Sequence, residues 1–184
     1  MRAHILALLA SMLFIFVPLA ARAADVRAID TRASHASFTV THVLVQRVSG
    51  TLPILSGSLT FDADGALSGA SAELDPKHID TKDQDRDVDL QSGDWFDAAR
   101  FPRWTFKSTS VESAPGGASK IAGLLTIHGQ SVPVVLAVQS SGSGASRAYI
   151  ATTHVDRHAF GMARTTYDAL VGADIAIELR VVAR

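Results

Sequence analysis

Apolar and polar residues alternate with a period of two through most of this chain, and this pattern constrains the fold more than any other feature. The clearest segment is 174–180, in which Ile175, Ile177 and Leu179 share one face. Side chains of a β-strand point alternately to its two faces, so the segment predicts a strand with one apolar side. Further alternating segments are 38–42, 58–61 and 104–107.

Turn-forming residues separate these segments. Asp62-Ala63-Asp64-Gly65 follows one predicted strand. Gly129-Gln130-Ser131 joins 123–128 to 132–138, which predicts a hairpin. The aspartate-rich segment 81–99 lacks the alternation and predicts a helical or irregular excursion across one end of the sheet. Many antiparallel strands at short spacing predict either a sandwich or a barrel. Large apolar groups on one face of several strands suit a closed sheet, so the fold class predicted is all-β, an antiparallel barrel of about eight strands with one short helical excursion.

The first 23 residues are predicted to be a secretory signal peptide. Arg2 is followed by the apolar run 5–19 and by Ala21-Arg22-Ala23, an A-x-A cleavage site. An uncleaved membrane anchor is the alternative, because the uncharged run 3–21 is nearly long enough to span a bilayer. We expect cleavage, a single barrel domain over 24–184, and a periplasmic location.

Composition excludes several functional classes. The formal net charge is −1, so the chain lacks the surplus of basic residues that is typical of nucleic-acid-binding proteins. The chain has no cysteine, which excludes disulfides and thiolate metal sites. No G-x-S-x-G elbow in a strand-to-helix context and no glycine-rich phosphate loop is present. The chain is therefore predicted to have no catalytic residues, and a binding protein is favoured over an enzyme.

Two polar patterns raise the question of a metal. The run 83–89 with Asp94 has carboxylates at alternate positions, as in a calcium loop, but Val88 replaces the loop glycine and Asp94 the final glutamate. A solvated acidic loop with helix-capping aspartates explains this run better. The four histidines considered as metal ligands are His42, His128, His154 and His158. They form no local ligand pair, so neither a metal nor a cofactor is predicted.

Several blocks in a fixed order resemble the YceI-like lipid/polyisoprenoid-binding family of exported lipocalin-like barrels. The resemblance runs from about Ile29 to Val182, and its most specific part is 90–102, Leu-Gln-Ser-Gly-Asp-Trp-Phe-Asp-Ala-Ala-Arg-Phe-Pro. Two departures stand close to it: Asp89, where the family often has histidine, and Trp95, where phenylalanine is common. The other similar blocks are 29–42, 48–62, 79–87, 123–134 and 155–162.

The resemblance implies binding rather than turnover. It implies that a polyisoprenoid, an isoprenoid quinone or another amphiphilic or fatty lipid occupies an apolar barrel cavity. It also implies a membrane cytochrome of the b561 type as a partner, and a homodimer. The alternatives are a non-catalytic stress-response or redox-partner accessory module and, with less support, a small-molecule enzyme.

Candidate cavity residues are the large apolar side chains of the predicted inner face and of the barrel mouth. They are Phe38, Val40, Leu59, Phe61, Trp95, Phe96, Phe101, Trp104, Phe106, Leu125, Ile127, Leu136, Phe160, Met162, Ile175 and Ile177. A barrel filled by its own side chains would show the same alternation, so an empty interior is not established by the pattern. Arg157 and His158 are the candidates for contact with a polar lipid head at the mouth.

Overall fold

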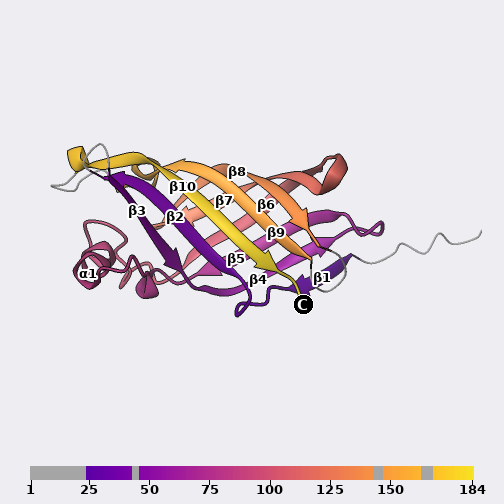
Figure 1. Ribbon diagram of the computed structural model, residues 1–184, viewed down its shortest axis with the longest axis horizontal. Helices are drawn as coiled ribbons and strands as arrows, with labels where there is room; N and C mark the ends of the chain where they lie inside the picture. Colours follow the sequence, from indigo (N-terminus) through magenta and orange to yellow (C-terminus); the bar gives the residue numbers. More distant parts are fainter. Residues whose placement is uncertain (1–23, 43–45, 143–146, 163–167) are drawn as a thin grey trace, which may run out of the picture.

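The computed structural model describes residues 24–42, 46–142, 147–162 and 168–184, so the predicted signal peptide lies outside the described residues. Ten strands form one antiparallel sheet in the order β1-β4-β5-β6-β7-β8-β9-β10-β2-β3 (Figure 1). The strands are β1 (Asp25–Ala28), β2 (His35–His42), β3 (Gln46–Leu52), β4 (Ile54–Phe61), β5 (Leu67–Leu74), β6 (Trp104–Ser113), β7 (Ala118–Ile127), β8 (Gln130–Ser141), β9 (Ala148–Asp156) and β10 (Val171–Val182).

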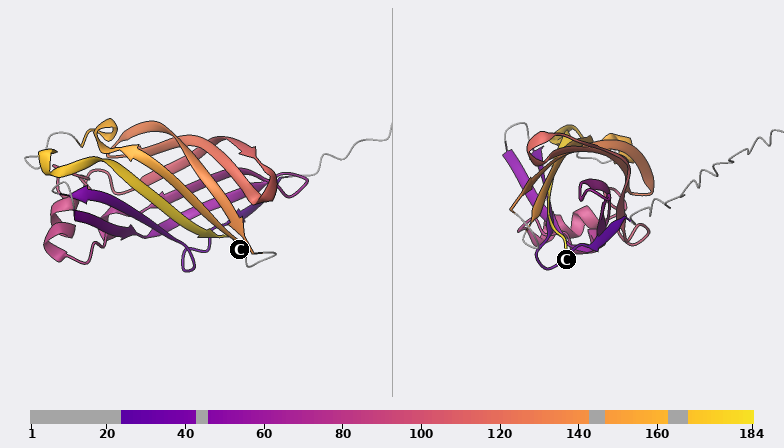
Figure 2. Two further views of the ribbon diagram at one scale, coloured as in Figure 1. Left: turned by 45° about the horizontal axis from the view of Figure 1, so that its top comes forward. Right: turned by 90° about the vertical axis from the view of Figure 1, so that its right-hand side faces the viewer.

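The sheet curves into a barrel because its two edges are connected. β3 pairs with β2 at one edge and β4 pairs with β5 near the other, yet they are consecutive in the chain and meet at Pro53. β1 pairs with β4, while the Asp30 amide donates to the Val182 carbonyl at 2.8 Å and the Arg184 amide to the Ala28 carbonyl at 2.9 Å. The end-on view shows the resulting ring of strands (Figure 2).

This architecture confirms the predicted antiparallel lipocalin-like barrel, with ten strands rather than about eight. Two features account for the difference. β1 is a short additional strand of four residues. The run from Gln46 to Phe61 is divided at Pro53, whose ring nitrogen carries no hydrogen to donate to a neighbouring strand.

Local sequence explains the turns. The predicted hairpin is β7–β8, and its two turn residues, His128 and Gly129, have φ values of 50° and 73°. Two consecutive positive φ values characterise the tight turns whose twist matches that of paired strands. After β4, the Asp62 carboxylate accepts from the amides of Asp64 at 3.0 Å and Ala66 at 2.8 Å, so the predicted aspartate turn is also confirmed.

The excursion, which we define as residues 75–103 between β5 and β6, lies at one end of the barrel (Figure 1). It contains η1 (Pro76–His78) and the eight-residue helix α1 (Gln84–Gln91). Asp83 caps α1 by accepting from the Arg86 amide at 3.1 Å. Backbone hydrogen bonds between Thr51 and Asp80, 2.9 and 3.0 Å long, connect the excursion to β3. The predicted interruption of the sheet is therefore confirmed, and its helix begins directly after a capping aspartate.

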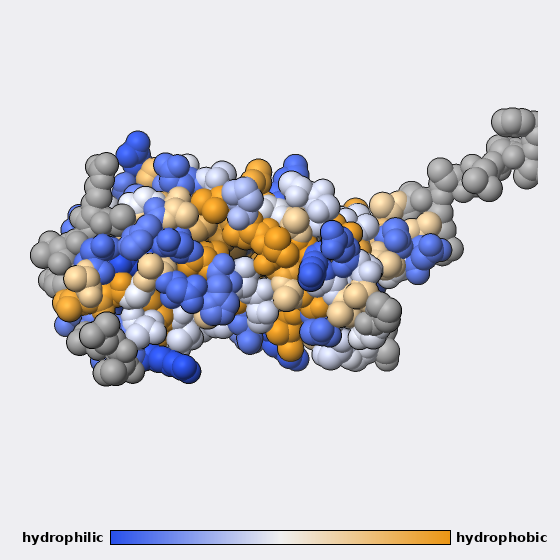
Figure 3. All heavy atoms as spheres, turned by 90° about the horizontal axis from the view of Figure 1, so that it is seen from above, coloured by the Kyte–Doolittle hydropathy of each residue, from blue (hydrophilic) through white to orange (hydrophobic). Residues whose placement is uncertain are grey.

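The remaining short helices are η2 (Pro115–Gly117), η4 (Arg157–Phe160) and η5 (Asp168–Leu170). Within the described ranges, no helix combines the length and the hydropathy needed to cross a bilayer. Seen from above, the outer surface shows a strip of hydrophobic residues flanked by hydrophilic ones (Figure 3).

The barrel has a filled end and an open end. The filled end lies beside β1, where Ile29, Leu59, Phe61 and Tyr149 are buried in one hydrophobic cluster. The rings of Phe61 and Tyr149 are 6.2 Å apart there, and the Arg27 guanidinium lies 4.7 Å from the centre of the Phe61 ring. The open end lies beside α1, and it contains the cavity described below.

Gly123→Ala is expected to lower the free energy of unfolding by about 1–3 kcal/mol, the usual cost of overpacking a core. A Cβ at Gly123 would lie 2.6 Å from the backbone oxygen of Lys107 and 2.6 Å from the Phe106 ring. Urea denaturation followed by circular dichroism measures the change. Gly93→Ala is the control, because its Cβ would meet nothing within 4 Å. Equal losses in the two variants would contradict the prediction.

Candidate functional site

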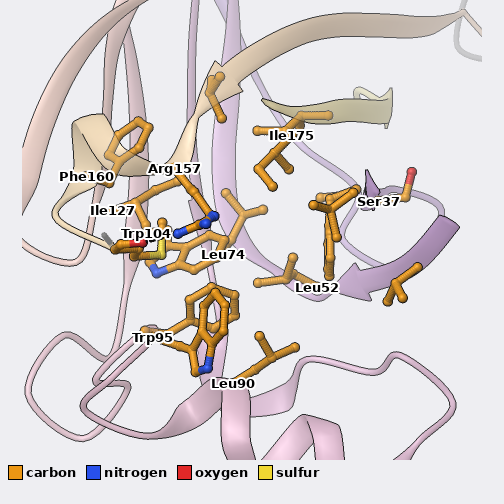
Figure 4. A pocket seen from close by; sticks show the side chains of 18 of the residues that line it. Ser37, Leu52, Leu74, Leu90, Trp95, Trp104, Ile127, Arg157, Phe160 and Ile175 are labelled. Carbon is orange, nitrogen blue, oxygen red and sulfur yellow. Dashed lines mark hydrogen bonds between the residues drawn. The ribbon is translucent and has the colours of Figure 1, made fainter. Parts of the chain in front are cut away.

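A cavity of about 600 Å³ occupies the open end of the barrel. The inner faces of β2, β6, β7, β8, β9 and β10 form its walls, and the excursion closes part of its mouth. In Figure 4, Leu90 and Trp95 of the excursion lie on the opposite side of the central space from Ile175, while Trp104 and Arg157 approach from a third side. Because most of the residues that line it are apolar, the cavity suits a hydrocarbon ligand.

The structure places all but three of the predicted cavity residues around this space. Whether they bind lipid stays a prediction, but their common position is a result of the fold. They are Phe38, Val40, Trp95, Phe96, Trp104, Phe106, Leu125, Ile127, Leu136, Phe160, Met162, Ile175 and Ile177.

Leu59, Phe61 and Phe101 are the exceptions. Leu59 and Phe61 are buried, as predicted, but they belong to the filled end and do not line the cavity. Phe101 packs outside the cavity, with its ring 5.0 Å from the ring of His128. It also covers Gly129, where a Cβ would lie 2.5 Å from the Phe101 ring.

Aromatic side chains give the cavity wall its shape. Phe96 and Trp104 meet edge to face with their ring centres 4.6 Å apart. Opposite Phe38 in the strand pairing is Gly50, where a Cβ would lie 2.6 Å from the Phe38 ring, so the ring occupies the space that a larger residue would need. The chain has two tryptophans, Trp95 and Trp104, and both line the cavity. Tryptophan fluorescence therefore reports directly on this space.

Sequence reasoning missed several lining residues. Val134 and Leu179 could have been found, because they lie two positions from Leu136 and Ile177 on the same faces. Leu90 gave no such signal, since it belongs to the irregular excursion. The other missed apolar residues are Ala36, Val48, Leu52, Leu74, Val155 and Val171. The missed polar residues are Ser37, His42, Asp83, Asp85, Arg86, Asp89 and Thr153.

Arg157 lines the cavity as a structural residue of its wall. Its side chain is only 3% exposed. The guanidinium donates to the carbonyls of Gly172 at 3.1 Å and Val171 at 2.8 Å, to those of Met162 and Asp168, and forms an ion pair with the Asp168 carboxylate at 2.7 Å. Since an arginine has five N–H donors, this network leaves it little capacity for a lipid head.

His158 does not line the cavity. Its ring contacts the carboxylates of Asp168 at 3.0 Å and Asp156 at 3.3 Å. Arg157 thus lines the cavity and His158 does not, although both contact the Asp168 carboxylate, and whether either of them meets a lipid head stays a prediction. Among the residues that the structure describes, no group of three His, Cys, Asp or Glu side chains is arranged to hold a metal ion.

The ionised Asp168 carboxylate is stabilised by its partners. The Arg157 hydrogen bond and then the His158 hydrogen bond hold the pKa of Asp168 below its usual value of 3.8. A lowered pKa in the folded state adds stability above the unfolded value, and this stability is lost as the pH falls through the folded value.

We therefore expect Asp168→Asn to lower the melting temperature at pH 7, and we expect its difference from the wild type to disappear once the pH is well below 3.8. Thermal unfolding followed by circular dichroism at both pH values measures the effect. A difference that persists unchanged in acid would contradict the ionic explanation.

Comparison with known proteins identifies the family. The model of the YceI-like domain matches residues 28–183, nearly all of the described chain. This chain belongs to the YceI-like domain family. The family resemblance seen in the sequence is thereby confirmed. A UPF0312 protein of Vibrio cholerae is 32% identical over 173 residues, which cover 89% of this chain and 91% of the relative. A UPF0312 protein of Vibrio vulnificus is 36% identical over 135 residues, covering 72% and 71%.

Solved structures share the fold of this YceI-like protein. BcnA of Burkholderia cenocepacia aligns with a TM-score of 0.78 and 25% identity, over 85% of this chain and 99% of its own. The YceI protein of Campylobacter jejuni aligns with a TM-score of 0.67 and 22% identity, over 78% and 89%. A polyisoprenoid-binding domain from Saccharophagus degradans, implicated in plant cell wall breakdown, aligns with a TM-score of 0.59 and 12% identity, over 85% and 97%.

Proposed function

We propose that this protein is a periplasmic, non-catalytic carrier that holds a polyisoprenoid, an isoprenoid quinone or another amphiphilic lipid in the open end of its barrel. The observation that carries the proposal is the apolar cavity of about 600 Å³. This volume lies within the range of roughly 300–1,000 Å³ that small-molecule sites occupy.

The hydrophobic effect provides the driving force. Each buried methylene contributes about 0.8 kcal/mol, so a segment of about fifteen buried carbons gives about 12 kcal/mol. Association costs roughly 4–15 kcal/mol in lost motion of the partners. The two quantities are similar, so affinity should rise steeply with the length of chain enclosed.

Further support comes from two directions. One structural relative is itself a polyisoprenoid-binding domain, and it shares this barrel. The predicted signal peptide at residues 1–23 supports export to the periplasm. The proposal also includes two protein partners, a membrane cytochrome of the b561 type and a second copy of the chain in a homodimer. Both rest on the family resemblance.

Titration with geraniol, farnesol and geranylgeraniol tests lipid binding, with the fluorescence of Trp95 and Trp104 as the readout. We expect affinity to increase strongly along the series. Cell fractionation tests the location, and native mass spectrometry of the mature protein, recovered from the compartment in which it is found, tests the natural ligand. A protein that stays in the cytoplasm would contradict the location. Ligand-free protein with no response to any of the alcohols would contradict the carrier.

A further inference from the structure

Most of the charged side chains at the mouth of the cavity belong to one helix, and most of those are negative. Asp83, Asp85, Arg86 and Asp89 all line the cavity, and all belong to α1 or its cap. The other described charged or titratable lining residues are His42 on β2 and Arg157 in η4. We expect the polar end of an enclosed amphiphile to lie beside α1, at the open end of the cavity.

Within the part of the chain that the structure describes, the two arginines that line the cavity are already held by other groups of the protein. Arg157 is held by backbone carbonyls and by the ion pair with Asp168 at 2.7 Å. Arg86 donates to the Thr81 hydroxyl at 2.9 Å and to the Thr81 carbonyl at 2.9 Å, and its guanidinium lies 3.5 Å from the Asp83 carboxylate. Neither guanidinium is presented to the cavity as a free cation that could hold a phosphate or a carboxylate.

The start of α1 is equally unsuited to an anion. Backbone amides at the first turn of a helix can bind anions, but here the Asp83 carboxylate already accepts from one of them, the amide of Arg86. Asp85 and Asp87 add further negative charge to the same turn. An anionic head would therefore meet carboxylates where other helices offer amides.

Asp85 and Asp89 are the carboxylates that the described contacts leave unpaired at the mouth. They are one turn apart, so they lie on the same face of α1. Leu90, the next residue, points into the cavity (Figure 4). The same helix thus contributes an apolar side chain to the wall and two exposed carboxylates beside it, where the polar head of an enclosed amphiphile would meet solvent.

We propose that Asp85 and Asp89 determine which head groups the site accepts: ends that donate hydrogen bonds and carry no negative charge, such as an alcohol or an ammonium. Carboxylates accept hydrogen bonds from such groups and repel phosphates and fatty-acid carboxylates. This inference rests on the proposed carrier function and narrows its ligands, since the head of an oxidised quinone accepts hydrogen bonds but donates none.

The test compares ligands that share one chain and differ in the head: geranylgeraniol, geranylgeranylamine and geranylgeranyl monophosphate. At about 10 mM salt, where the screening length is roughly 30 Å, the wild type should bind the alcohol and the amine at least tenfold more tightly than the phosphate. The discrimination should shrink at about 1 M salt, where the screening length is roughly 3 Å. Tryptophan fluorescence gives the dissociation constants.

The double variant Asp85→Asn/Asp89→Asn should bind the phosphate more tightly, and its discrimination should fall to less than threefold. The matched control is Asp64→Asn/Glu112→Gln, which makes the same change in charge at exposed positions of the filled end and should leave the discrimination intact. Circular dichroism checks that both variants fold.

Each outcome decides a different question. Equal affinity for alcohol and phosphate in the wild type, or unchanged discrimination in the Asp85/Asp89 variant, would overturn the inference while leaving the carrier function intact. Failure of all three amphiphiles to bind would overturn the carrier function and this inference together.

Discussion

Ile177→Asp is expected to weaken binding of geranylgeraniol at least a hundredfold. Ile177 lies on β10 with its side chain on the cavity wall. An apolar ligand would have to strip water from the new carboxylate, and burying an unpaired charge costs several kcal/mol. The free energy of unfolding should also fall by about 2–5 kcal/mol, as for other losses of a large aliphatic side chain from a core. Fluorescence titration and urea denaturation measure the two effects.

Glu178→Lys is the matched control for this prediction. Glu178 is the next residue along β10, and it is exposed on the outer face. Reversal of an exposed charge there should change stability by less than about 0.5 kcal/mol and leave binding unaltered. If the two variants behave alike, the faces of β10 have been assigned incorrectly.

The second large effect is expected for Arg157→Met, which should lower the free energy of unfolding by about 3–5 kcal/mol. Methionine keeps much of the length of the side chain but none of its donors. The substitution removes the guanidinium from the carbonyls of Val171 and Gly172, and it leaves the Asp168 carboxylate with His158 alone. Unmade hydrogen bonds at buried groups cost more than the bonds themselves contribute. Urea denaturation at pH 7 measures the loss.

Arg103→Met provides the comparison. Arg103 forms an ion pair with Glu73 at 2.7 Å, but its side chain is 58% exposed, and exposed pairs contribute about 1 kcal/mol or less. Losses of similar size in the two variants would show that the buried network around Arg157 has no special role in stability.

The alternation of the sequence predicted the faces of the strands because burial on one side requires it. On β10, Ile175 and Ile177 point into the barrel as the pattern indicated. The β7–β8 hairpin follows in the same way, since Gly129 allows the positive φ that its turn needs. The resemblance to YceI-like proteins added the closed form of the sheet, which alternation alone left undecided.

The same pattern does not predict where along the barrel axis a residue lies. Leu59 and Phe61 alternate as well as Ile175 does, but the pattern carries no information on which end of the barrel is filled. That depends on partners distant in sequence, such as Tyr149 against Phe61.

Phe101 shows a different limit of sequence reasoning. It follows Trp95 and Phe96 closely, but Asp97 has a φ of 41° and accepts a hydrogen bond from the Phe101 amide at 2.8 Å, so the chain turns between them. Phe101 then packs on His128, outside the cavity that Trp95 and Phe96 line. A turn made by a non-glycine residue in the left-handed region gives a weak sequence signal, because such residues rarely adopt it.

The packing of side chains beside β1 makes the barrel a blind tube. In the proposed carrier, an amphiphile would enter this tube tail first and leave head first through the same open end, so one molecule would have to leave before another could bind. Any part of the ligand longer than the tube would stay outside, beside α1. A membrane or protein that supplies the ligand and one that receives it would therefore have to bind the same end of the barrel one after the other. The ligand would not pass through the barrel from one end to the other.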